Sequence, residues 1–296
     1  MNNELLLHWY EHPKKLGNFG DELNHYLINK ITNKTISNFP KKYIEKSNFY
    51  VFKKLLGRLR YNDLKLKDIK NSVEYKIIFN PLYIVIGSII SWYDRPNVIV
   101  WGAGIMSKTE NVKKANFLAV RGYYTAERLK ELGFKAPSVF GDRALLLPLF
   151  YKPKEIKKID NLIIPHVTQF EEALKIFNNR KDVEVLDLCD SIETIIDKIN
   201  CANNIYSSSL HGIIVAHAYN KKALWTNFSH LKINGDNIKF KDYFSSLRIE
   251  EYDYFEVKKN EDFDYLVQKS FIDLYNPQSK IIEQVQKDLL KVCPFL

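Results

Sequence analysis

Residues 162–227 read LIIPHVTQFEEALKIFNNRKDVEVLDLCDSIETIIDKINCANNIYSSSLHGIIVAHAYNKKALWTN, and this stretch decides the fold. Short apolar runs alternate in it with segments whose apolar residues recur at helical spacing. We expect strands at 162–165, 183–188, 204–207 and 223–227, and helices at 171–177, 192–199 and 213–219. Apolar strands that alternate with helices form parallel sheets covered on both faces. The stretch therefore predicts an α/β domain.

The first half of the chain repeats this rhythm. We expect strands at 4–10, 82–86, 98–101 and 117–120, and helices at 22–31 and 124–132, the second stopped by Gly133. The polar, lysine-rich residues 151–160 read as a linker. We therefore predict two α/β domains, at roughly 1–150 and 160–275. Apolar residues at helical spacing predict a terminal helix within 276–296 that packs back on the first domain.

Composition and charge bound the function. The chain has 296 residues, of which 46% are hydrophobic and 27% charged, which rules out global disorder. The net charge of +9 favours anionic partners. The three cysteines, Cys189, Cys201 and Cys293, are far apart, so we expect reduced thiols and a cytoplasmic protein. We expect no signal peptide, and the longest apolar stretch, 81–92, is too short to span a bilayer.

Loops at the carboxyl ends of parallel strands carry ligand sites, and three such loops hold chemistry-bearing residues. The first is Gly17–Glu22, GNFGDE, which joins a strand to a helix. Its glycines allow close approach to a ligand, and the helix N-terminus favours an anion. Asp21 is either a general base or the cap of this helix.

The second loop, Ser207–Gly212 (SSSLHG), follows an expected strand and opens a helix. Its three hydroxyls and free amides could cradle a phosphate, with His211 as acid, base or anion partner. An ordinary serine-capped helix with a satisfied histidine explains the same spacing. In the third loop, Arg121 ends an apolar run, where a guanidinium suits a carboxylate or phosphate or forms a surface salt bridge.

Other ligand motifs are weak or absent from the sequence. No H-E-x-x-H pair is present, so we expect no metal site. There is no Walker A loop, and Gly102-Ala103-Gly104 lacks the third glycine of a dinucleotide fingerprint.

Residues 41–70 contain ten Lys or Arg and three acidic residues. Phe52, Leu55, Leu56 and Leu59 form an apolar stripe there, with Lys53, Lys54, Arg58 and Arg60 nearby. A basic amphipathic helix of this kind lies on an anionic membrane, or its stripe packs on the core while its charges are solvated.

Taken in order, these loops resemble the polysaccharide pyruvyl transferase family over most of the chain. The resemblance rests on Gly17–Glu22, Trp101–Gly104, Arg121, Gly141-Asp142, Ser207–Gly212 and the stretch KFKDYFSS at 239–246. It implies a GT-B-like pair of Rossmann-like domains with the active site in the interdomain cleft, the acceptor side in 1–150 and the donor side in 160–275. It also implies phosphoenolpyruvate as co-substrate, no cofactor and no metal, and a glycan or lipid-linked oligosaccharide acceptor of capsule, exopolysaccharide or lipopolysaccharide synthesis. The product would be a cyclic pyruvate ketal, with phosphate released.

The resemblance also assigns roles to residues. Arg121 would grip the donor, His211 would contact the phosphate or act as acid, and Asp21 would act as base toward the acceptor hydroxyl, with the acid and base assignment left open. Lys239 would add donor charge. The remaining substrate-binding candidates are Asn18, Gly20, Gly104, Ser207, Ser208, Ser209, Leu210 and Arg143.

Two positions depart from the family pattern. Many members have arginine where this chain has Ser209, and the common G-D-P is here Gly141-Asp142-Arg143. Arg143 is therefore a candidate for the missing cation.

Two alternatives remain open at this stage. The first is a nucleotide-sugar glycosyltransferase of the same architecture. The second is a basic binding module centred on 41–70. We expect no nucleic-acid role, because the basic run is one segment and the glycine-rich loops lie elsewhere. Peripheral contact with the inner membrane face through 41–70 would hold the enzyme near a lipid-linked acceptor.

Overall fold

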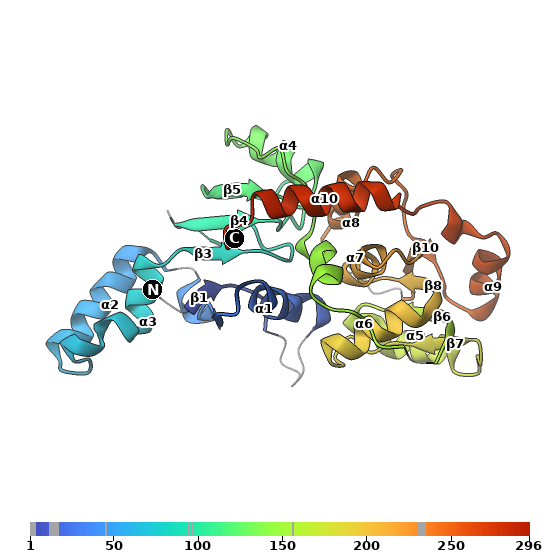
Figure 1. The fold of residues 1–296 in the computed structure, drawn as a ribbon, viewed down its shortest axis with the longest axis horizontal. Coiled ribbons are helices and arrows are strands. Elements are labelled where there is room, and N and C mark those ends of the chain that lie inside the picture. Colours follow the sequence, from blue (N-terminus) through green and yellow to red (C-terminus); the bar gives the residue numbers. More distant parts are fainter. Residues whose placement is uncertain are drawn as a thin grey trace.

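Two parallel five-stranded sheets form the framework of the computed structural model, which describes residues 4–11, 18–44, 46–93, 95, 97–155, 157–229 and 235–296 (Figure 1). The first sheet has the order β2 (Thr35–Asn38), β1 (Glu4–Leu7), β3 (Leu82–Ile84), β4 (Val98–Trp101) and β5 (Asn116–Ala119). The second has the order β10 (Phe255–Glu256), β9 (Ala223–Asn227), β8 (Ala202–Ser207), β6 (Ile159–Ile164) and β7 (Val183–Val185). All the paired strands are parallel, so the prediction of an α/β fold with two Rossmann-like sheets is confirmed.

Helices connect and cover these strands. The α-helices are α1 (Phe19–Thr32), α2 (Asn48–Arg60), α3 (Val73–Phe79), α4 (Tyr123–Glu131), α5 (Phe170–Phe177), α6 (Ile192–Cys201), α7 (Leu210–Ala218), α8 (Ile238–Ser246), α9 (Asn260–Gln268) and α10 (Ser279–Lys291). Short 3-10 helices are η1 (Lys41–Tyr43), η2 (Leu66–Asn71), η3 (Arg143–Leu149), η4 (Val167–Gln169) and η5 (Phe271–Asp273).

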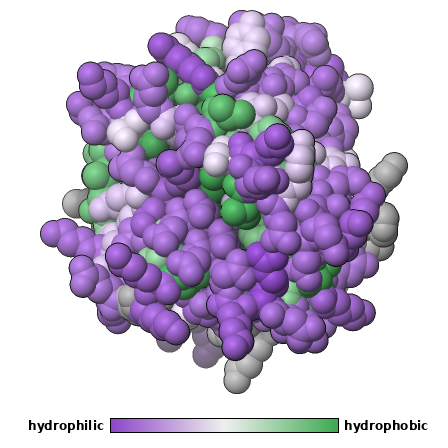
Figure 2. Space-filling view, turned by 90° about the vertical axis from the view of Figure 1, so that its right-hand side faces the viewer, coloured by the Kyte–Doolittle hydropathy of each residue, from purple (hydrophilic) through white to green (hydrophobic). Residues whose placement is uncertain are grey.

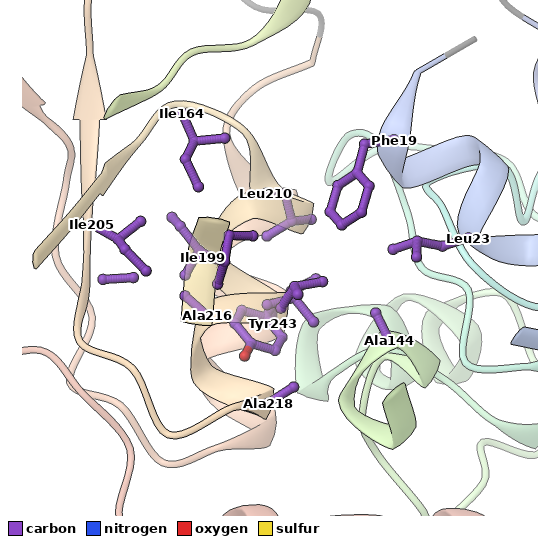
Figure 3. Packing of buried hydrophobic residues seen from close by; sticks show 14 of the residues in the cluster. Phe19, Leu23, Ala144, Ile164, Ile199, Ile205, Leu210, Ala216, Ala218 and Tyr243 are labelled. Carbon is purple, nitrogen blue, oxygen red and sulfur yellow. The ribbon is translucent and has the colours of Figure 1, made fainter. Parts of the chain in front are cut away.

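Helix α7 occupies the centre of the molecule. Apart from His211, every one of its residues is buried, as expected for a helix that is apolar on all sides. Its first turn packs tightly on the second sheet, because a Cβ on Gly212 would lie 2.6 Å from Ser207 Oγ and 2.9 Å from Ile164 Cγ2. On its other side α7 packs against η3 and α1. In Figure 3, Leu210 of α7 and Phe19 of α1 point toward each other across this contact.

One hydrophobic core continues from the first sheet into the second. It includes Leu7 and Trp101 on one side and Leu162 and Ile205 on the other. The division into domains at 150 and 160 stays a prediction, since the core does not stop there and β6 begins at Ile159. A second core, around Val100, covers the opposite face of the first sheet.

The terminal helix α10 packs over the first sheet and η3. Trp101 Nε1 donates to Leu289 O at 3.1 Å, and Gln286 Nε2 donates to Leu145 O at 2.7 Å. The Phe295 ring lies 4.7 Å from the Tyr83 ring, centroid to centroid.

Helices α2 and α3 project from the end of the first sheet (Figure 1, left). Val51 and Leu55 of α2 are buried, while Arg58 Nη1 bonds Glu74 Oε2 of α3 at 2.7 Å. The pair therefore forms a hairpin whose remaining α2 surface faces outward.

Candidate functional site

The N-termini of α1 and α7 meet where the two halves join. A Cβ atom on Gly20 would lie 2.1 Å from Nδ1 of His211, so the first turn of α1 touches the imidazole directly. Phe19 N donates to Leu188 O at 2.9 Å, which ties the start of α1 to the second half. The N-terminal ends of two helix dipoles thus lie in one region, which favours an anion there. Gly17, the first residue of the predicted motif, lies outside the described residues.

Asp21 stands in the first turn of α1 and does not cap it. The helix begins at Phe19 with Asn18 as N-cap, so the interpretation of Asp21 as the cap is wrong. Asn18 Nδ2 donates to Asp21 Oδ2 at 3.2 Å. Burial raises the pKa of Asp21 to about 7, with the Glu22 charge acting in the same direction, while Asn18 and Lys239 oppose the shift. Burial outweighs the effects of Asn18 and Lys239, and the carboxyl group can exchange a proton near neutral pH.

The carboxylate of Asp142 lies close to the imidazole of His211. Nε2 of His211 lies 3.8 Å from Oδ2 of Asp142, and the His211 side chain keeps 15% exposure while that of Asp142 has none. The Asp142 side chain is therefore shielded from solvent, whereas His211 is partly accessible. Asp142 Oδ1 accepts from Ala144 N at 2.9 Å and caps η3, whereas neither Oδ2 nor His211 Nε2 has a hydrogen-bond partner in the described part of the chain.

The charge state of His211 follows from the same surroundings. Burial lowers its pKa, Asp142 opposes this, and Arg121 and Lys239 lower it further. The imidazole is therefore neutral near pH 7, ready to accept a proton with Asp142 positioned to stabilise the resulting cation.

Lys239 belongs to the same group of charges. It is the second residue of α8, and burial lowers its pKa to about 8, with Arg121 lowering it further and Asp21 raising it. Lys239 thus interacts electrostatically with both Asp21 and His211, although α1, α7 and α8 are far apart in the sequence. We call these three residues the central triad.

Arg121 is fully buried, and three of its guanidinium nitrogen atoms donate hydrogen bonds. Its Nε donates to Asp242 Oδ2 at 3.0 Å, Nη1 to Ser88 Oγ at 2.6 Å and Nη2 to Ile105 O at 2.6 Å. It forms neither a surface salt bridge nor an exposed anion clamp. Its charge nevertheless acts on both His211 and Lys239.

Gly104 and Gly122 leave space for the buried Arg121–Asp242 pair. A Cβ on Gly104 would lie 2.6 Å from Arg121 Cζ, and one on Gly122 would lie 1.7 Å from Asp242 O. Gly104, a predicted substrate contact, therefore serves the Arg121–Asp242 pair in this structure.

The serines of the β8–α7 turn hold the backbone. Ser207 Oγ donates to Ile164 O at 2.9 Å and accepts from Ser209 N at 3.0 Å, and Ser208 Oγ accepts from His166 N at 2.8 Å. Ser209 is the N-cap of α7 without a side-chain capping bond. The prediction of a cradle of three hydroxyls is therefore wrong for Ser207 and Ser208, whose hydroxyls fix the turn that presents His211.

Arg143 does not join the triad. Its guanidinium stacks 4.3 Å from the Trp101 ring, with Nε donating to Trp101 O at 2.6 Å. Burial lowers its pKa to about 9. It points into the core beneath α10, so the prediction that it replaces a cation at the position of Ser209 is wrong.

Asp142, Asp242 and Ser88 complete the site, and sequence reasoning did not single them out. Asp142 and Asp242 stand inside the motifs GDR and KFKDYFSS, which were the available signal. Within the described residues, no group of three or more His, Cys, Asp or Glu side chains could hold a metal ion. In the same residues, no helix is both long enough and apolar enough to cross a bilayer.

Comparison with known proteins identifies the family of this chain. Residues 18–230 match the family model described as polysaccharide pyruvyl transferase. "Uncharacterized protein L143" of Acanthamoeba polyphaga mimivirus is 31% identical over 183 residues, which cover 59% of this chain and 63% of that relative. The chain thus spans less than two thirds of that relative's length. Among solved structures, the glycosyltransferase SnogD from Streptomyces nogalater aligns with 98% of this chain and 95% of its own, with a TM-score of 0.38 and 8% identity.

Proposed function

The chain belongs to the polysaccharide pyruvyl transferase family, and from this premise we propose that it transfers the enolpyruvyl group of phosphoenolpyruvate to a sugar diol. The product would be a cyclic pyruvate ketal on a bacterial surface glycan, such as a capsule or exopolysaccharide, or on its lipid-linked precursor. Phosphate would leave. The observation that carries the proposal is the central triad, with proton-exchanging groups and cations gathered where two helix N-termini meet.

The triad suits a small, doubly anionic enol ester. Phosphoenolpyruvate has a phosphate and a carboxylate, and both need cationic or N–H donors at short range. Lys239 and the amides at the start of α7 would supply these donors. Buried Arg121 would contribute positive electrostatic potential to the site without contacting phosphoenolpyruvate. We propose that no cofactor is needed beyond phosphoenolpyruvate as co-substrate.

The transfer balances with two proton movements. One acceptor hydroxyl adds to C2 of the enol as C3 gains a proton, and the C2–O bond to phosphate then breaks. The second hydroxyl closes the ketal at C2. Of the two hydroxyl protons, one ends on C3 as part of a methyl group and the other on the released phosphate.

The protonation states of Asp21 and His211 favour one assignment of acid and base. Asp21, with a pKa of about 7, is partly protonated at neutral pH and suits protonation of C3. His211, neutral and backed by Asp142, suits removal of the hydroxyl proton. This reverses the assignment that the resemblance suggested.

Phosphate release and product mass test the function. Protein, phosphoenolpyruvate and a panel of methyl pyranosides should yield phosphate and a product heavier than the glycoside by one ketal-linked pyruvate. His211→Ala should abolish turnover without lowering Tm substantially. A thermal-shift screen separates the glycosyltransferase alternative: stabilisation by nucleoside diphosphates and none by phosphoenolpyruvate would overturn our proposal.

We further propose that the α2–α3 hairpin contacts the anionic inner face of the cytoplasmic membrane, placing the enzyme at a lipid-linked acceptor. Phe49, Phe52 and Leu56 are 66%, 41% and 48% exposed, and their spacing puts them on one face of α2. Exposed Lys53 and Arg60 border this face. By contrast, Figure 2 shows mostly hydrophilic side chains at the opposite end of the molecule.

Vesicle sedimentation tests this contact. Binding to vesicles containing anionic lipid should fall sharply when Lys53, Lys54 and Arg60 are changed to Gln. Arg58 is left intact because it pairs with Glu74. The control changes Lys280, Lys287 and Lys291 of α10 to Gln, which removes the same charge from another surface. Equal loss in both variants, or none in either, would reject a specific contact.

A further inference from the structure

A cavity with binding chemistry lies at the carboxyl ends of β1 and β2, and none of the central triad lines it. It measures about 510 Å³. Its lining includes Trp9, Tyr10, Glu11, Asn38, Phe39, Lys41 and Trp92. Ligand sites of parallel sheets concentrate at this edge. We call it the aromatic pocket.

Aromatic side chains that are only partly covered form its walls. Trp92 is 37% exposed and Tyr10 is 42% exposed, while Trp9 and Phe39 are buried beneath them. Open aromatic faces in a pocket offer large apolar area at low entropic cost. The C–H faces of a pyranose ring complement such surfaces.

Fixed polar groups stand beside these rings. Asn38 Nδ2 donates to Glu11 Oε1 at 3.0 Å and to Trp9 O at 3.2 Å, and Trp9 N donates to Asn38 Oδ1 at 3.3 Å. The Glu11 carboxylate is thereby oriented while retaining acceptor capacity for hydroxyl groups. Glu11 and Lys41 carry opposite charges in one lining, so the pocket has no excess of positive charge for a phosphate or diphosphate and suits a neutral polyol.

Helix α1 connects the pocket to the central triad, because its His25 contacts Trp9 of the lining and its Asp21 belongs to the triad. The Trp9 ring lies 5.9 Å from the ring of His25, which is about one helical turn after Asp21 on the same side of α1. In the other direction, a smaller pocket of about 290 Å³ shares Ile44 and Trp92 and extends to Ser47, the N-cap of α2. The aromatic pocket thus lies between the triad and the hairpin proposed to contact the membrane.

We propose that the aromatic pocket binds a pyranose ring of the acceptor saccharide, stacked on Trp92 and Tyr10 with its hydroxyls on Glu11 and Asn38. The proposal rests on the proposed function in that it names the ring as part of the acceptor. Binding itself does not depend on turnover, so the two can fail separately.

Tryptophan fluorescence provides a direct binding test. Of the four tryptophans, Trp101 and Trp225 have at most 1% exposure and Trp9 has 7%, so acrylamide quenching reports mainly on Trp92. Titration with methyl α- and β-pyranosides and disaccharides should protect the fluorescence from quenching in a saturable manner. Protection should vanish in Trp92→Phe, and Glu11→Gln should weaken saccharide affinity while keeping the fold.

Kinetics separate the pocket from the chemistry. Trp92→Ala should raise KM for the acceptor by about fivefold or more and leave KM for phosphoenolpyruvate unchanged. Tyr265→Ala, which removes a 52% exposed aromatic ring from α9, is the matched control and should change neither value.

Each outcome has a distinct meaning. Turnover with unchanged acceptor KM in Trp92→Ala would overturn the pocket assignment and leave the proposed function standing. Saturable saccharide protection without pyruvyl transfer would support the pocket and overturn the proposed function. Protection by nucleosides but not by saccharides would assign the pocket to a base and overturn the proposal.

Discussion

Gly20 and His211 are in contact so close that no side chain fits between them: a Cβ on Gly20 would stand 2.1 Å from the imidazole Nδ1. The two residues are 191 positions apart in the sequence. The first turn of one helix therefore sets the position of the histidine at the start of another, and a single methyl group can test whether that position matters.

Replacing Gly20 with Ala should displace His211 and reduce kcat at least tenfold. The overlap involves ring atoms of a side chain packed at the centre of the molecule, so a rotation of the ring away from Asp142 is the cheapest relief. Phosphate release gives kcat, and circular dichroism checks the fold.

The matched control is Gly57→Ala in α2, where an added Cβ meets nothing within 4 Å. Alanine is favoured over glycine in a helix interior, so this variant should gain about 0.5–1 kcal/mol of stability and keep full activity. If Gly20→Ala also keeps full activity, the position of His211 is not critical.

Asp142→Asn should lower kcat at least tenfold with little change in KM for phosphoenolpyruvate. An Asn side-chain oxygen can still cap η3 at Ala144, but the charge behind His211 disappears. Because Asp142 raises the pKa of His211, the variant should move the acidic limb of the pH–rate profile to lower pH. NMR titration of the imidazole checks the shift; an unmoved histidine pKa would contradict the pairing.

Continuous apolar runs made much of the framework predictable. The strands β4 and β9 begin and end at the predicted residues, because each is an apolar run between polar or glycine-containing loops. Strand β2, with the sequence TISN, was not predicted. Its polar residues carry no strand pattern, and it is a strand because its whole length pairs with β1.

The site could be predicted only in part. Loops after expected strands led to Asp21, His211 and Arg121, since strand ends of parallel sheets meet at one edge. The burial of Arg121 could not be foreseen, because it depends on Asp242 arriving from α8, 121 residues away. The direction of the Arg143 side chain could not be foreseen for the same reason. It points into the core because α10 packs over Trp101.

Asp242→Ala should destabilise the protein severely. The Asp242 carboxylate accepts from Arg121 Nε and from Thr125 N and Oγ1, and its removal leaves a buried guanidinium without a countercharge. Breaking such a pair costs about 3–5 kcal/mol. Urea denaturation measures the loss.

The double variant Arg121→Met/Asp242→Leu separates pairing from packing. It removes both charges, so it should be more stable than Asp242→Ala alone. A double variant that is less stable than the single one would mean that the side-chain shapes, and not the uncompensated charge, dominate.

Asp21→Asn should stabilise the protein at pH 8 relative to wild type and have much less effect at pH 5. The pKa of Asp21 rises from its ordinary value of 3.8 to about 7 on folding, so the protonated form is favoured in the native state. Its stabilising contribution is complete below about pH 4 and is lost as the pH rises through 7, where the buried carboxyl must ionise. Asparagine stays neutral throughout, so the difference in Tm between variant and wild type should grow by about 2–4 °C or more between pH 5 and pH 8. Differential scanning calorimetry at both pH values provides the measurement.

The control is Asp264→Asn, which replaces an exposed carboxylate on α9 and should show no such growth of the Tm difference toward alkaline pH. A Tm difference for Asp21→Asn that is constant with pH would mean that Asp21 ionises in the folded protein at its ordinary pKa. Asp21 could then not act as a proton donor at neutral pH.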